Sequence, residues 1–174
     1  MIKLAIGIDP GKEGFITVNN NMIGTYYHYE MPKIGGEIDL KELNRIFEEG
    51  MYPESKDKIK VHAVLEDVHS IPGSSAVSNF QFGRTVGIIQ ALLVANNIPF
   101  TLVQPKAWQK EMWQGIPIQK KHGTKKTDTK LMSKMAARRL FPEMDFKRND
   151  RCKVDDHNKI DSLLMCEYCI RKII

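Results

Sequence analysis

The chain has 174 residues, of which 42% are hydrophobic and 27% charged, so we expect one globular domain spanning residues 1–174. No apolar run approaches the roughly 18 residues of a membrane span, and the N-terminus lacks the cleavage pattern of a secretion signal. The three cysteines are an odd number, so we expect free thiols in a cytoplasmic protein that does not associate with membranes.

Positive charge is concentrated in one part of the chain. The formal net charge is +5, yet residues 106–139 contain ten Lys and Arg against two acids and therefore carry +8. The remainder of the chain is net negative, at −3. This segregation predicts a surface for a polyanion, with nucleic acid as the first candidate, although a plain solvated surface is an equally common outcome for a lysine-rich stretch.

The chain begins with three predicted strands, at residues 3–9, 14–18 and 23–29. A glycine-rich turn joins the first two, and the segment Asn19-Asn20-Asn21 tolerates the positive φ of a tight hairpin, so an antiparallel meander is expected. Apolar residues at helical spacing then predict a helix over 39–47, with Asp39 as its N-cap.

A buried strand at 61–68 and a long helix over 78–96 follow. Gly83, Gly87 and Ala91 share one face of that helix, which predicts that its backbone approaches the sheet closely there.

From residue 100 onward, the sequence pattern predicts a short strand followed by helices. These elements are a strand at 100–103, a helix starting at 105, a loop at 115–123, and helices over 127–140 and 156–174. A meander followed by alternating strands and helices predicts an α/β fold, in which a mixed sheet has helices on its faces.

Three acidic residues stand at the ends of predicted elements. Asp9 ends the first strand directly before a Pro-Gly turn, Glu66 closes the apolar run 61–65, and Asp161 opens the apolar helical segment 162–165. An acid that ends a core strand is held by the sheet yet faces a cleft, which suits a metal ligand or an acid/base group. The alternative for any one of them alone is a helix cap or a turn former.

These acids lie in the segments Gly7-Ile8-Asp9-Pro10-Gly11, Leu65-Glu66-Asp67 and Asp161-Ser162-Leu163-Leu164-Met165. The order and spacing of these segments resemble those of the RuvC-type Holliday junction resolvases, especially the phage-encoded branch. The resemblance extends to the segments at 68–75, 79–84, 105–110 and 136–142. That family belongs to the ribonuclease H-like superfamily. The resemblance implies a mixed five-stranded sheet flanked by helices, in a protein of a bacterial cell or a phage-infected host cell.

The resemblance also implies a site for two divalent ions, Mg²⁺ with Mn²⁺ as a substitute, in which Asp9 bridges both ions and Glu66 and Asp161 each complete one site. Relatives carry a fourth ligand three or four residues before the last Asp. Here the residue four before Asp161 is His157, the residue three before it is Asn158, and the nearest preceding acid is Asp156. We favour His157, because imidazole binds Mn²⁺ or acts as a base, and keep Asp156 as the alternative, in a possible role as helix N-cap.

The DNA-contacting residues are expected among aromatic and basic side chains in the segments of resemblance and in the basic region. They are Phe80, Phe82, Arg84, Lys106, Lys110, Lys125, Lys126, Lys130, Lys134 and Arg138. Phe80 and Phe82 are as well explained by core packing, and Trp108 and Trp113 are expected to be packing residues. A zinc site using Cys166, Cys169 and other ligands is disfavoured, since both cysteines lie in an apolar helix.

The resulting interpretation is a metal-dependent endonuclease that resolves four-way (Holliday) or other branched DNA junctions by paired nicking, as a homodimer whose two-fold symmetry matches the substrate. The alternatives are a nuclease of the same fold acting on another nucleic acid, in RNA processing or transposition, and a non-catalytic junction-binding protein. An actin-like or sugar-kinase ATPase is disfavoured, because 174 residues leave no room for its second lobe.

Overall fold

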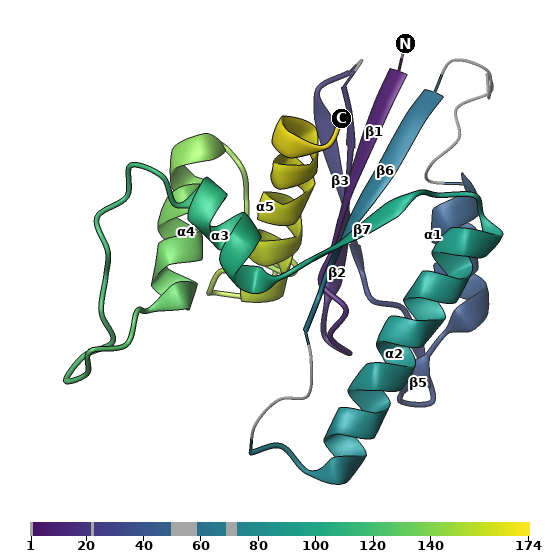
Figure 1. Ribbon diagram of the computed structural model, residues 1–174, viewed down its shortest axis with the longest axis horizontal. Coiled ribbons are helices and arrows are strands. Elements are labelled where there is room, and N and C mark those ends of the chain that lie inside the picture. Colours follow the sequence, from purple (N-terminus) through teal and green to yellow (C-terminus); the bar gives the residue numbers. More distant parts are fainter. Residues whose placement is uncertain (1, 22, 50–58, 69–72) are drawn as a thin grey trace.

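The computed structural model describes residues 2–21, 23–49, 59–68 and 73–174. Its centre is a mixed five-stranded sheet, as the resemblance implied, and the strand order is β3-β2-β1-β6-β7 (Figure 1). The strands are β1 (Ile2–Ile8), β2 (Phe15–Asn20), β3 (Thr25–Glu30), β6 (Ile59–Glu66) and β7 (Phe100–Val103). The first three form the expected antiparallel meander, and β6 and β7 continue the sheet in parallel with β1.

Helices cover both faces of the sheet (Figure 1). One face carries α1 (Leu40–Glu49) and α2 (Ala76–Ala95), and the other carries α3 (Pro105–Met112), α4 (Thr129–Leu140) and α5 (His157–Lys172). A small hairpin, β4 (Lys33–Ile34) and β5 (Glu37–Ile38), precedes α1 and was not predicted, because its two-residue strands are too short for a periodic signal.

The alternation of side chains along β1 assigns each residue to one of two cores. Leu4, Ile6 and Ile8 pack in the core beneath α1 and α2. Ala5 packs in the core beneath α3, α4 and α5. Because successive strand residues point to opposite faces, Gly7 and the following Asp9 belong to the α5 face.

Aspartate side chains cap the N-termini of three described helices. Asp39 accepts a hydrogen bond from the backbone N–H of Glu42, which confirms the predicted cap of α1. Asp128 and Asp156 cap α4 and α5 in the same way. None of the described helices is both long and apolar enough to cross a membrane.

The prediction for the small-residue face of α2 was wrong. A Cβ atom placed on Gly83 or Gly87 would meet nothing within 4 Å, and Ala91 is exposed. The residues of α2 that are buried are Thr85, Ile89 and Leu93, which lie on the opposite side of the helix. The large side chains therefore face the sheet, and the glycines face outward.

Candidate active site

Asp9 and Glu66 stand side by side at one edge of the sheet. Parallel pairing aligns Ile8 with Leu65, so the next residue of each chain segment is one of the two acids. Val64 packs in the core beneath α3, α4 and α5, and Glu66, two residues on, points to the same face. Both carboxylates therefore lie at the carboxyl ends of parallel strands and on the face that α5 covers.

The turn after β1 holds the Asp9 side chain. The backbone N–H of Gly11 donates to Asp9 Oδ1 at 3.0 Å, and the N–H of Asp9 donates to the carbonyl of Phe15 at 3.0 Å. A Cβ on Gly14 would lie 2.1 Å from the Asp9 carbonyl oxygen, so only glycine allows the chain to pass this closely. The Pro-Gly turn seen in the sequence is thus a carboxylate-positioning turn.

Asp161 reaches the same edge from α5, which packs on β1, β2 and β6. Its neighbour Ser162 is fully buried, and the Ser162 hydroxyl lies 2.7 Å from the hydroxyl of Thr17 on β2. The Ser133 side chain of α4 hydrogen-bonds the Asp161 carboxylate, yet Asp161 Oδ1 is buried with no hydrogen-bond partner in the described ranges. A buried carboxylate oxygen without a partner is costly unless a ligand satisfies it.

The three carboxyl groups share an environment that disfavours negative charge. Burial raises the pKa of Asp9 to about 6. The hydrogen bond from Gly11 lowers this pKa, and the charge of Asp156 raises it further. Burial raises the pKa of Glu66 to about 7, which a hydrogen bond from Trp108 opposes and the charge of Asp9 increases. Burial likewise raises the pKa of Asp161 to about 7, and the charges of Asp9 and Glu66 add to the rise.

These side chains suit a divalent cation by chemical type. Carboxylate oxygens are the ligands that Mg²⁺ and Mn²⁺ prefer, and positive charge would relieve the repulsion among these three partly buried acids. Within the described ranges, however, no three His, Cys, Asp or Glu side chains stand close enough together to hold an ion in this conformation. Holding a metal would require the carboxylates to draw closer together.

Of the candidates for a fourth ligand, two are engaged elsewhere. Asp156 is the N-cap of α5, accepting from the N–H groups of Asn158 and Lys159, and it also accepts from Arg148 at 2.6 Å. The amide of Asn158 donates to the Glu13 carbonyl at 2.9 Å. By contrast, His157 Nδ1 is buried and has no hydrogen-bond partner among residues 2–21, 23–49, 59–68 and 73–174.

Arg148 is a residue of the site region that sequence reasoning missed. Besides Asp156, its guanidinium binds Glu30 of β3 at 2.8 Å and the carbonyl of Glu13 at 2.8 Å, and it lies over the Phe15 ring at 4.8 Å. It therefore ties the turn that carries Asp9 to the start of the helix that carries Asp161. These partners are up to 135 residues away in the chain, so no local pattern signals them.

Two of the three predicted cations on α4 are paired within the protein. Lys134 and Arg138 each contact Asp155 at 2.9 Å, and Arg138 also lies 4.6 Å from the Phe146 ring centroid. Although burial acts in the opposite direction, the hydrogen bonds from Lys134 and Arg138 lower the pKa of Asp155. Lys130, one turn earlier, is exposed.

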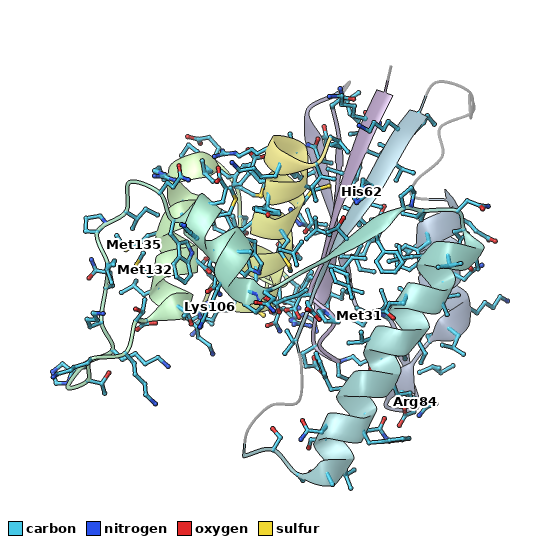
Figure 2. All side chains as sticks on the ribbon, viewed as in Figure 1. Met31, His62, Arg84, Lys106, Met132 and Met135 are labelled. Atoms are coloured by element: carbon cyan, nitrogen blue, oxygen red, sulfur yellow. The ribbon has the colours of Figure 1, made fainter. Side chains whose placement is uncertain are left out.

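The other predicted cations of the basic region are exposed on two elements. Lys106 and Lys110 lie on α3, and Figure 2 shows Lys106 at the start of that helix. Lys125 and Lys126 lie in the segment between α3 and α4, which extends away from the rest of the protein (Figure 1). This segment is braced at its base by a bridge between Lys120 and Thr127.

Phe80, Phe82 and Arg84 all lie on α2, on the opposite face of the sheet from α3 (Figure 2 labels Arg84). Phe80 is 69% exposed, so the core-packing alternative for it is wrong. Phe82 is half-buried and lines a cavity of about 360 Å³ together with Lys12 of the turn that follows Asp9. Arg84 binds Glu37 of the small hairpin at 2.9 Å. Part of the neighbouring segment of resemblance, at 69–72, lies outside the described residues.

The expected packing roles of other residues are observed. Trp108 is fully buried, and its indole N–H donates to Glu66 Oε1 at 2.9 Å, a bond that the sequence did not predict. The thiols of Cys166 and Cys169 are buried in α5 and donate to the carbonyls of Ala5 and His62. Both cysteines therefore behave as core residues rather than as zinc ligands.

Solved structures of other proteins have the same architecture as this chain. The chain is similar to RuvC of Thermus thermophilus in complex with a Holliday junction substrate, with a TM-score of 0.51 and 11% identity over 97% of this chain and 95% of that chain. A structure of Thermus thermophilus RuvC gives a TM-score of 0.50 and 14% identity over 98% of this chain and 96% of that one. No family model and no curated protein matches the sequence. The chain has the ribonuclease H-like fold of RuvC.

Proposed function

We propose that this protein is a metal-dependent endonuclease that cleaves branched DNA, with the four-way (Holliday) junction as its principal substrate. The observation that carries the proposal is the meeting of Asp9, Glu66 and Asp161 at one edge of the sheet, where they are partly buried and repel one another. Among the described residues, Asp161 Oδ1 has no hydrogen-bond partner. The fold shared with RuvC agrees with this assignment.

Asp9, Glu66, Asp161 and His157 would hold the divalent ions, with Mg²⁺ preferred and Mn²⁺ as a substitute. The chemistry that bound ions would supply there is activation of the attacking water and stabilisation of the leaving oxygen of the phosphodiester. The chain itself orients the ligands: the Gly11 N–H holds Asp9, and the Ser133 side chain holds Asp161.

Exposed lysines on α3, on the segment after it and at the start of α4 would bind the DNA backbone. They are Lys106, Lys110, Lys125, Lys126 and Lys130. Phosphate contacts of this kind fix the position of a duplex without reading its sequence. Phe80, with most of its ring exposed, would stack on bases near the crossover.

A homodimer would place one active site on each of two opposed strands. The outer face of α2 supports this assembly, because it exposes apolar and small residues together. Val94 is 66% exposed, and a Cβ atom added to Gly83 or Gly87 on the same face would meet no described atom within 4 Å. Removing such a face from water by pairing with its copy is favourable.

The proposal is tested with a labelled four-way junction and a matched linear duplex, each with and without Mg²⁺. We expect cleavage of the junction only, and only with the metal. Asp9→Asn, Glu66→Gln and Asp161→Asn should each abolish cleavage while leaving junction binding, measured by gel shift, largely intact. Glu143→Gln removes an exposed carboxylate and is the matched control, with cleavage unchanged.

Other outcomes would change the assignment. Cleavage of RNA or linear DNA in preference to junctions would indicate a nuclease of the same fold with another substrate. Tight junction binding with no cleavage under any divalent metal would indicate a non-catalytic binding protein.

The dimer is tested on a supercoiled plasmid that extrudes a cruciform. Paired nicking within one complex gives linear DNA, whereas independent nicking gives open circles. Val94→Glu on the outer face of α2 should convert the protein to a monomer by light scattering and convert the product from linear to nicked circles. A monomeric wild-type protein that still yields linear product would contradict the proposed dimer.

A further inference from the structure

Trp108 and Glu66 are joined by a hydrogen bond between two different elements. The indole Nε1 of Trp108, on α3, donates to Glu66 Oε1, at the end of β6, with a distance of 2.9 Å. We infer that Trp108 is a positioning residue for Glu66, setting the carboxylate in the orientation that metal binding requires. This inference rests on the proposed function, because it concerns the metal site assigned there.

The donor in this pair is held far more firmly than the acceptor. Trp108 has no exposed surface and packs in the core with Val64, Met112 and Phe146. Glu66 is a more flexible side chain than tryptophan, stands at a strand end, and is only partly buried. When a rigid group and a flexible group share a hydrogen bond, the rigid one sets the geometry, so Trp108 orients Glu66.

The position of α3 is in turn fixed from both ends. Pro105 starts α3 directly after β7, whose Val103 pairs with Glu66 in the sheet register. At the other end, Arg139 of α4 donates to the carbonyls of Met112 and Gln114, and Lys172 of α5 binds Glu111 of α3 at 3.0 Å. Trp108 is therefore carried on a helix that three neighbouring elements anchor.

The chemistry of the bond suits a metal ligand. An indole N–H is a donor only, so it cannot compete for the cation. It occupies one carboxylate oxygen and leaves the second for coordination, and it stabilises the charged form of Glu66 against the effect of burial. Hydrogen bonds that orient metal ligands in this way contribute about 10–100-fold to metal affinity.

Trp113 provides a matched control. It is the second of the two tryptophans of the chain, it lies at the C-cap of the same helix, and it packs against the same core. Its Nε1 is buried but has no hydrogen-bond partner among the residues that the structure describes. Trp113→Phe removes an indole that makes no such bond, whereas Trp108→Phe removes the one that binds Glu66.

The test measures binding of Mn²⁺ alone to the full chain, without DNA, by the electron paramagnetic resonance signal of the free ion. We expect Trp108→Phe to weaken Mn²⁺ binding about ten-fold or more, and Trp113→Phe to leave it unchanged. In Trp113→Phe, Trp108 is the only remaining tryptophan, so its fluorescence should be quenched by Mn²⁺ with the same dissociation constant.

A second variant separates the effect of the hydrogen bond from the effect of packing. In the Trp113→Phe background, incorporation of β-(3-benzothienyl)alanine for tryptophan replaces the N–H at position 108 by sulfur and keeps the bicyclic shape. This protein should also lose Mn²⁺ affinity about ten-fold. If it is folded by circular dichroism and binds Mn²⁺ as tightly as Trp113→Phe, the inference is overturned.

The Mn²⁺-binding results distinguish an error in the proposed metal site from an error in the role of Trp108. If the wild type binds Mn²⁺, and Glu66→Gln weakens that binding but Trp108→Phe does not, only the role of Trp108 is overturned. Failure of the wild type to bind Mn²⁺ would overturn the proposed metal site and, with it, this role.

Discussion

Gly7 of β1 and Ser162 of α5 stand in direct backbone contact. A Cβ atom on Gly7 would lie 2.1 Å from the Ser162 carbonyl oxygen and 2.3 Å from the backbone nitrogen of Cys166. The helix can cross the strand this closely only because Gly7 has no side chain. That crossing places Asp161, the residue before Ser162, next to the strand end that carries Asp9.

Gly7→Ala should therefore displace α5 and destabilise the protein by about 3 kcal/mol or more, because backbone atoms cannot yield as a flexible side chain would. The measurement is urea unfolding followed by circular dichroism. Gly83→Ala is the control: it lies in the exposed part of α2, where a Cβ meets nothing, and should stabilise the protein by about 0.5–1 kcal/mol. Equal stability of Gly7→Ala and the wild type would show that α5 can shift at little cost.

The fourth metal ligand is tested with one pair of variants. His157→Ala should strongly reduce cleavage with little loss of stability, because His157 Nδ1 has no hydrogen-bond partner within the described part of the chain. Asp156→Ala should retain cleavage under stabilising conditions yet lower the free energy of unfolding by about 2 kcal/mol, since it removes a helix cap and a charged hydrogen bond to Arg148. His157→Asp should restore cleavage with Mg²⁺, which prefers oxygen ligands.

The opposite pattern, an active His157→Ala beside a well-folded but inactive Asp156→Ala, would assign the ligand to Asp156. Thermal unfolding of both variants distinguishes loss of chemistry from loss of fold.

Exposed and paired cations should behave differently in DNA binding. Replacing Lys125 and Lys126 by Ala should make the slope of log affinity against log salt shallower by about 1.8, at about 0.9 for each phosphate that is no longer neutralised. Arg138→Ala should change that slope little and instead lower stability, because Arg138 binds Asp155 and the Phe146 ring. The affinity is measured by fluorescence anisotropy over a range of salt concentrations.

An unchanged slope in the Lys125→Ala, Lys126→Ala protein would place the DNA elsewhere. A large slope change in Arg138→Ala would mean that DNA displaces Asp155 from the guanidinium.

The lowered pKa of His28 predicts that the protein loses stability in acid. Burial, with a smaller contribution from Lys159, lowers the pKa of His28 from 6.5 to about 4, and its Nδ1 lies 3.0 Å from the Thr17 hydroxyl. Between these two pH values the unfolded chain binds a proton at His28 and the folded chain does not, so stability falls as pH decreases from 6.5 towards 4. The size of this effect is about 3 kcal/mol.

The measurement is the difference in unfolding free energy between the wild type and His28→Asn at pH 7 and pH 4.5. Contributions of the buried carboxyl groups, which act in the opposite direction, are common to both proteins and cancel in the difference. The wild type should lose more stability than the variant; parallel pH profiles would show that His28 is protonated without cost in the folded state.

The sequence by itself determined the elements and the acids that end them. Period-two and helical spacing are local properties, so the meander, the parallel strands and the long helices could be predicted within a few residues. Asp9 and Glu66 could be placed at strand ends because the apolar runs before them end there. The mixed sheet followed from the order of these elements.

The tertiary structure decided which side chains meet. Trp108 and Glu66 are 42 residues apart, and Asp155 and Arg138 are 17 apart, so their bonds depend on how the helices pack and have no signal in local spacing. The outward orientation of Gly83 and Gly87 was mispredicted for the same reason: helical spacing shows which residues share a face, but only the packing of Ile89 and Leu93 against the sheet decides where that face points.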